Sequence, residues 1–147
     1  MNNLLVPGHW IEVKDGDDRV RGIIKSHYSR RHYKDGRKPK QFIGPGEKLV
    51  LLSQDCRAVF AWRKFIDKSS QTGVNNCIFR NTGAILSSQL ILEAETFAWY
   101  RWPSERLYTY INPEKIRSTN PGYCYLKAGW KKCGMTKGGL LILEKLP

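Results

Sequence analysis

Long apolar runs are missing from this sequence. The longest runs, such as Leu49 to Leu52, fall far short of the roughly 20 residues that a membrane-spanning helix needs. Met1 to Pro7 lack the basic start and the long apolar stretch of a secretory leader. No two of the four cysteines are closely spaced, so no zinc framework is indicated. We therefore expect a cytoplasmic protein with free thiols and no membrane partner.

The common enzyme signatures are also missing. The sequence contains no P-loop, no dinucleotide-binding fingerprint, no metalloprotease motif and no pair of carboxylates at a suggestive spacing. It has no internal repeat and no low-complexity segment. These absences argue against the enzyme classes that such motifs define, and the sequence does not predict an oligomeric state.

Acidic residues are scarce. The chain has 13 Asp and Glu against 25 Lys and Arg, which gives a net charge of +12. Such a field attracts polyanions, and nucleic acid is the polyanion that basic proteins most often bind. The plainer alternative is a basic protein without a special partner, because net charge does not define a site.

The hydrophobic pattern predicts one domain over residues 1–147. Helices are expected from Asp17 to about Ser26, and from Ser87 or Ser88 to just before Trp102. Strands are expected at 48–52, 57–65, 74–80, 106–111 and 138–145, with short helices or turns at 114–117 and 123–130. The predicted fold class is α/β in the mixed α+β sense, with a central mixed sheet and helices on its faces.

The first group of candidate functional residues follows the first expected helix. His27, Tyr28 and Ser29 combine an imidazole, a phenol and a hydroxyl, which can move protons or bind ligands. The basic loop after them suits phosphate contacts with occasional base stacking. The residues expected to bind nucleic acid are Ser29, Arg30, Arg31, Tyr33, Lys34, Arg37, Lys38 and Lys40. The alternatives are a core histidine and a solvated charged turn.

A second group joins an expected strand to an expected helix. Arg80 to Ile85 form a glycine-containing turn before Ser87 and Ser88. The free amides and the dipole at the start of a helix attract anions, although many plain connections look similar.

A third group lies near the end of the chain. Asn112-Pro113 and the stretch from Asn120 to Trp130 form rigid turns that display Tyr and Asn beside a strand end, as many α/β sites do. Core packing of Tyr125 and Trp130 is the alternative. Cys124 has no adjacent base in the sequence, so we interpret all four cysteines as structural.

The order of elements resembles the GNAT acyltransferase fold, whose central sheet is mixed and mostly antiparallel. That family has an Arg/Gln-x-x-Gly-x-Gly/Ala loop after a strand. Arg80 and Gly83 match this loop, while Ile85 stands where a small residue is expected. The resemblance implies acetyl-CoA or a related acyl donor as cofactor. It would be held by Phe79, Arg80, Asn81, Thr82, Gly83, Ser87 and Ser88.

A narrower likeness is to the phage Mom proteins, which are GNAT-like enzymes that modify DNA bases. His27-Tyr28-Ser29, the serines at 87 and 88, and Tyr125 five residues before Trp130 resemble their motifs. Those proteins are thought to use iron held by His, Tyr and Asp, but Asn112 stands near the Asp position and is a weaker, neutral ligand. The resemblance implies a catalytic set of His27, Tyr28, Ser88, Asn112 and Tyr125.

The resulting hypothesis is a phage-type DNA modification enzyme that adds an acyl-type group to a base or a modified base. The base would be flipped out of a duplex or already single-stranded. A first alternative is a GNAT N-acetyltransferase acting on a protein or small-molecule amine. A second alternative is a nucleic-acid-binding module without catalytic activity.

Overall fold

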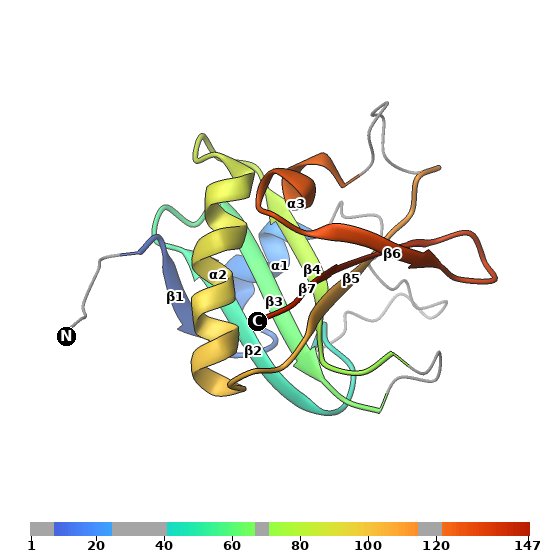
Figure 1. Ribbon diagram of the computed structural model, residues 1–147. Coiled ribbons are helices and arrows are strands. Elements are labelled where there is room, and N and C mark those ends of the chain that lie inside the picture. Colours follow the sequence, from blue (N-terminus) through green and yellow to red (C-terminus); the bar gives the residue numbers. More distant parts are fainter. Residues whose placement is uncertain (1–7, 25–40, 67–70, 115–121) are drawn as a thin grey trace, which may run out of the picture.

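The computed structural model describes residues 8–24, 41–66, 71–114 and 122–147. They form a seven-stranded sheet in the order β1-β2-β3-β4-β5-β7-β6 (Figure 1). The strands are β1 (Trp10–Val13), β2 (Glu47–Ser53), β3 (Ala58–Lys64), β4 (Val74–Asn81), β5 (Leu107–Ile111), β6 (Lys131–Met135) and β7 (Leu141–Lys145). Every neighbouring pair is antiparallel except β4 with β5.

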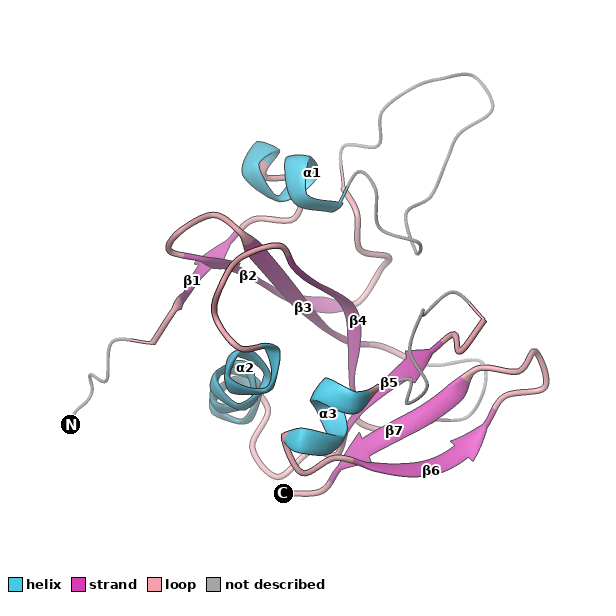
Figure 2. Cartoon of the chain, turned by 90° about the horizontal axis from the view of Figure 1, so that it is seen from above, coloured by secondary structure: helices cyan, strands magenta, loops and turns pink. Residues whose placement is uncertain are grey.

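Three helices cover this sheet. Helix α1 (Asp18–Ile24) lies on one side, whereas α2 (Ser87–Arg101) and α3 (Tyr123–Lys127) lie on the other (Figure 2). The predicted fold class, a mixed and mostly antiparallel sheet flanked by helices, is confirmed by this topology. No helix in the described ranges is long and apolar enough to span a bilayer.

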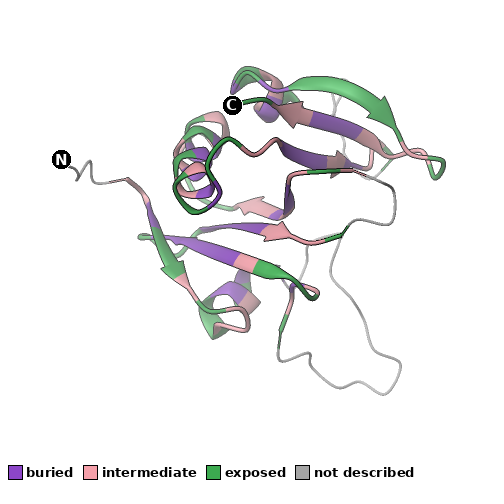
Figure 3. Ribbon diagram, turned by 60° about the horizontal axis from the view of Figure 1, so that its bottom comes forward, coloured by how far each residue is buried: buried purple, intermediate pink, exposed green. Residues whose placement is uncertain are grey.

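Most predicted elements are found within a few residues of their expected bounds, but two strands were missed. β1 is short, and β6 has all five residues exposed, so neither shows a buried run (Figure 3). Helix α2 begins at Ser87, but the interpretation that Ser87 or Ser88 caps it is wrong. The N-cap residue is Leu86 and no side chain caps the helix, because Ser87 already lies inside it.

The core has two parts, one on each face of the sheet. On the α1 face, alternate residues of β2, β3 and β4 pack under Val20, Ile23 and Ile24 of the helix. On the α2 face, a larger cluster joins aromatic side chains of β1, β3 and β4 to the apolar stripe of α2. Burial of apolar area at about 25 cal/mol per Å² is the main stabilising term in such a core.

Indole groups fix helix α2 against the sheet. Trp10 Nε1 donates to Leu90 O at 2.9 Å, and Trp62 Nε1 donates to Ala94 O at 3.0 Å. Trp130 Nε1 donates at 2.8 Å to Oε2 of Glu95, which also lies on α2. Buried indole N–H groups need such acceptors, so these bonds set both the height and the rotation of the helix.

Glu95 is a buried carboxylate that links α2 to the end of the sheet. Lys145 Nζ on β7 lies 2.9 Å from Glu95 Oε1 and donates to Ala128 O at 2.6 Å. Burial raises the pKa of Glu95, while Lys145 and Trp130 lower it. Glu95 and Lys145 neutralise each other, so removing only one of the two side chains leaves the charge of the other without a partner.

We predict that Lys145→Met destabilises the protein by about 3 kcal/mol, measured as the free energy of unfolding in urea. The double variant Glu95→Gln/Lys145→Met should recover most of this loss, because no buried charge then remains and the side-chain amide oxygen at position 95 can still accept the Trp130 N–H. Lys64→Met is the matched control, since Lys64 and Glu105 form a pair in which each side chain is 36% exposed. Equal losses in Lys145→Met and Lys64→Met would contradict the prediction.

Candidate active site

The candidate site lies where β4 and β5 part. The two strands pair in parallel only from Val74 to Asn76, opposite Leu107 to Thr109. β4 continues to Asn81 and β5 to Ile111, and Figure 2 shows the strands diverging there. No described strand pairs with the β5-facing edge of β4 after Asn76. Crevices at the carboxyl ends of parallel strands are common ligand sites in open sheets.

Asn76 and Tyr125 meet where β4 and β5 part. The Tyr125 hydroxyl donates to Asn76 Oδ1. Asn76 Nδ2 donates to Ala61 O at 3.0 Å and to Ile78 O at 2.9 Å, across a β-bulge between β3 and β4. Thr109 Oγ1 donates to Asn76 O at 2.9 Å. This network ties α3, β3, β4 and β5 together at the point of divergence.

The Tyr125 ring is packed in the core. It meets Phe79 with ring centroids 6.1 Å apart and Trp130 at 5.1 Å, both edge to face. The side chain is 5% exposed. The structure therefore gives Tyr125 an anchoring position, and its place in the catalytic set stays a prediction.

The loop after β4 is organised by Asn81, the last residue of that strand. Asn81 Nδ2 donates to Ile85 O at 2.7 Å and to Ser87 Oγ at 3.0 Å, and Asn81 Oδ1 accepts from Gly83 N at 3.0 Å. Thr82 N and Oγ1 both donate to Arg57 O. The loop is thus held from within and fixed to the β2–β3 turn.

Gly83 is the point where this loop touches the β2–β3 turn. A Cβ atom at this position would lie 2.8 Å from Arg57 Cβ and 3.3 Å from Asp55 Oδ2. A larger residue would push the loop outward, so glycine is required by close approach. The first turn of α2, which begins with Ser87 and Ser88, contains no acidic residue and no side-chain cap. Its amides suit an anion.

Two buried polar atoms on β4 have no hydrogen-bond partner. Among the described residues these are Asn75 Oδ1 and Arg80 Nε. The register places Asn75 opposite Arg63 and Arg80 opposite Val59, on the α1 face of the sheet. An unsatisfied buried group costs about 1–3 kcal/mol, so each calls for an explanation. Arg80 offers a donor to an anion, and Asn75 offers an acceptor to an N–H or O–H group.

Thiol chemistry is not favoured at this site. Burial raises the pKa of Cys77, which lies on β4, to about 12. Burial also raises the pKa of Cys124 on α3. Because the thiolate is the nucleophile, both groups are inert at neutral pH. All four cysteines have free thiols in this structure.

The remaining predicted site residues are distributed as follows. Asn112 directly follows β5, and its Oδ1 accepts the Glu114 amide at 3.0 Å in a local turn. Ser88 is half-buried on α2. His27 and Tyr28, and the predicted nucleic-acid-binding set from Ser29 to Lys40, lie outside the described residues. Whether His27 meets Tyr125 therefore stays a prediction.

The residues in the described ranges do not assemble a metal site. No group of three His, Cys, Asp or Glu side chains there could hold an ion. The Mom resemblance implies iron ligands near Tyr125 and Asn112, and both side chains form other hydrogen bonds. The Tyr125 hydroxyl donates a hydrogen bond to Asn76, and Asn112 Oδ1 accepts one from the Glu114 amide. Neither side chain is presented as a ligand.

Sequence reasoning missed Asn75 and Asn76. Two successive asparagines inside a strand that is otherwise buried were the available signal, because Asn is depleted in strands. Glu95, within the apolar stripe of α2, carried a similar signal.

Comparisons with known proteins give a structural likeness without a sequence match. No family profile matches this chain, and no curated protein matches it. A solved structure from Bordetella pertussis, assigned to the GnaT family of acetyltransferases, is similar over 86% of this chain and 71% of its own. The sequences are 11% identical and the TM-score is 0.47. A likeness at this level gives no information about activity.

We predict that Tyr125→Phe destabilises the protein by about 1–3 kcal/mol, because Asn76 Oδ1 loses its donor in a buried site. Urea unfolding followed by tryptophan fluorescence measures the change. Tyr123→Phe, at a 54% exposed position on the same helix, is the control and should unfold like the wild type. A stability of Tyr125→Phe equal to that of the control would show that the hydrogen bond is not formed.

Proposed function

We propose that this protein is a GNAT-like acyltransferase that modifies a base in DNA. The observation that carries the proposal is the open edge of β4, which runs between the point where β4 and β5 part and the first turn of α2, whose amides suit an anion. An acyl donor would lie along this edge, and the acceptor base would enter at the divergence of the two strands.

The β4 edge and the loop after it suit a donor such as acetyl-CoA. An unpaired strand edge presents alternating N–H and C=O groups, which can pair with the amides of an extended arm. The first-turn amides of α2 are suited to phosphates, and we propose that Arg80, near the end of β4, adds its positive charge from the α1 face of the sheet.

The bound donor supplies a thioester, and in the transfer a C–N bond to the acceptor forms, the C–S bond breaks and the thiolate takes up a proton. The protein's part is to position and polarise. We propose that N–H groups of β4 beyond Asn76, where no described strand pairs with this edge, stabilise the negative charge that develops on the acyl oxygen. His27 and Tyr28 are the proposed groups for removing the proton from the acceptor nitrogen.

The acceptor is proposed from charge. A field of +12 concentrates a polyanion around the molecule, whereas a small-molecule or protein amine has no need of it. The target base would be flipped out or single-stranded so that its nitrogen reaches the point where β4 and β5 part. The basic set from Ser29 to Lys40 is proposed to hold the phosphate backbone.

Donor binding is the first test. Acetyl-CoA at saturating concentration is expected to raise the Tm of the wild type by several degrees, since a ligand that binds only the folded state stabilises it. Arg80→Met should fold at least as stably, because the buried Nε without a partner is removed, yet show little of this rise. Arg101→Met, which removes an exposed pair with Glu12, is the control. No rise in the wild type would refute the donor site.

Base modification is the second test. We expect mass spectrometry of nucleosides from cells expressing the wild type to show a base with added acyl mass. The product should be absent with Arg80→Met or His27→Ala and present with Arg101→Met. If DNA stays unmodified while purified protein acetylates amines of proteins or small molecules, the acceptor proposal is wrong and the first alternative holds.

A further inference from the structure

The excess positive charge of this chain is confined to two segments. Residues 25–40 contain seven Lys and Arg against one acidic residue, and residues 115–147 contain the same numbers. The rest of the chain carries eleven basic and eleven acidic residues, so it is neutral. Only the second segment lies mostly within the described residues, and its charge can be placed on the fold.

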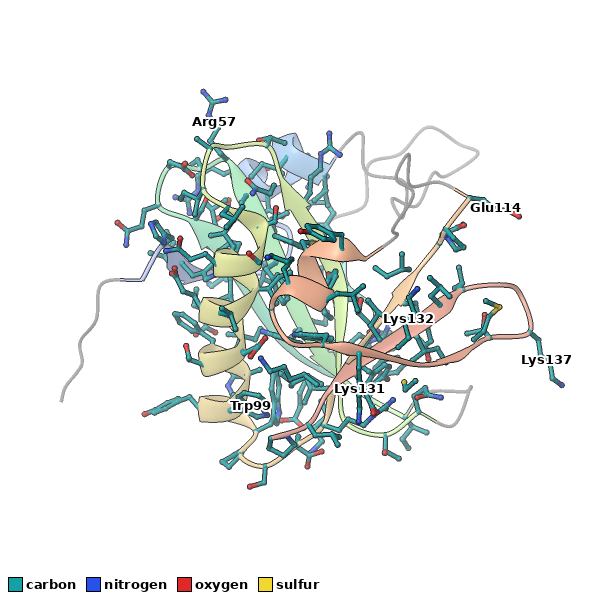
Figure 4. All side chains as sticks on the ribbon, turned by 45° about the horizontal axis from the view of Figure 1, so that its top comes forward. Arg57, Trp99, Glu114, Lys131, Lys132 and Lys137 are labelled. Atoms are coloured by element: carbon teal, nitrogen blue, oxygen red, sulfur yellow. The ribbon has the colours of Figure 1, made fainter. Side chains whose placement is uncertain are left out.

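Four lysines of this segment surround the edge strand β6. We call Lys127, Lys131, Lys132 and Lys137 the β6 lysine cluster. Lys127 lies on α3, Lys131 and Lys132 begin β6, and Lys137 projects from the tip of the β6–β7 hairpin (Figure 4). All four are exposed. Lys145, by contrast, is taken up by buried Glu95.

The cluster is not neutralised by the protein. Lys127, Lys132 and Lys137 form no ion pair within the described part of the chain. Lys131 is 4.0 Å from Glu144, and that carboxylate is already bound by Arg106 at 2.6 Å. The Arg106 hydrogen bond is also the main reason that the pKa of Glu144 is lowered. Exposed lysines without counter-charges raise the positive potential around β6, and that potential attracts a polyanion.

Protection of a sheet edge does not account for the whole cluster. Lysine on an exposed edge strand hinders pairing with other chains, and Lys131 and Lys132 could serve this purpose. Lys127 and Lys137 lie off the strand, on a helix and in a turn, where they block no ladder. Both are exposed and lie within four residues of β6 in the chain.

We propose that the β6 lysine cluster is a docking surface for the phosphate backbone of nucleic acid. The inference rests on the proposed function for its choice of partner, and it adds a second contact surface to the segment from Ser29 to Lys40. A two-stranded ribbon with basic residues along its edge and tip can follow a groove or a backbone. The cluster provides affinity and orientation without reading sequence.

The test is binding of a fluorescein-labelled duplex of mixed sequence, about two helical turns long, followed by anisotropy at several salt concentrations. Lys132→Gln/Lys137→Gln should weaken binding at least roughly tenfold near 50 mM salt. The slope of log K against log salt should fall by about 1.8, or about 0.9 for each phosphate that is no longer neutralised. The control variant Lys14→Gln/Arg19→Gln removes the same amount of charge. Lys14 is exposed next to β1, which is the sheet edge opposite β6, and Arg19 is exposed on α1. This control should change affinity much less than the cluster variant does.

Three outcomes would overturn the inference: no binding of the duplex by the wild type, an equal weakening in the control, or an unchanged salt slope in the cluster variant. Tighter binding of polyglutamate than of DNA would also overturn it and assign the surface to acidic protein instead. The measurement requires no donor and no turnover. If the protein binds DNA through the cluster but shows no Tm rise with acetyl-CoA, the proposed acyl transfer is refuted and the docking surface is not.

Discussion

The hydrogen bond between Tyr125 and Asn76 is the contact on which the arrangement of this domain depends. Asn76 occupies the last position at which β4 and β5 are still paired. Its side-chain nitrogen donates hydrogen bonds to the backbone carbonyls of Ala61 and Ile78 at the bulge, and its side-chain oxygen accepts one from the Tyr125 hydroxyl. A polar network this deep is favourable only when every member is satisfied, and it then selects a single packing. The two strands part beyond Asn76, so this network fixes the point at which they diverge.

β4 combines residues that stabilise the fold with residues that do not. Val74 and Phe79 pack into the α2-side core, and Asn76 is fully bonded. Asn75 Oδ1 and Arg80 Nε, on the other face, lack partners within the described ranges. Proteins tolerate such groups where a site needs them and offset the cost elsewhere, here through the tryptophan-clamped helix and the Glu95–Lys145 pair.

The sequence was sufficient to predict the central elements and insufficient for the edges and the site. β2, β3, β4 and α2 carry long apolar patterns, and their predicted bounds lie close to the observed ones. β1 and β6 are edge strands, which bury little and show no alternation. The loop from Arg80 to Ile85 was found by motif, but the Asn81 bonds that shape it depend on three-dimensional contacts. The partnership of Asn76 with Tyr125 joins residues far apart in the chain, which periodicity does not reveal.

Two tryptophans of the α2-side core stack on each other. Trp62 belongs to β3 and Trp130 follows α3, and their ring centroids lie 6.2 Å apart with an interplanar angle of 14°. Stacked indoles at this separation influence each other's absorption and emission, so the near-ultraviolet circular dichroism of the pair reports how the segment after α3 is packed against β3. A ligand that moves this segment relative to the sheet is therefore detectable without an attached label.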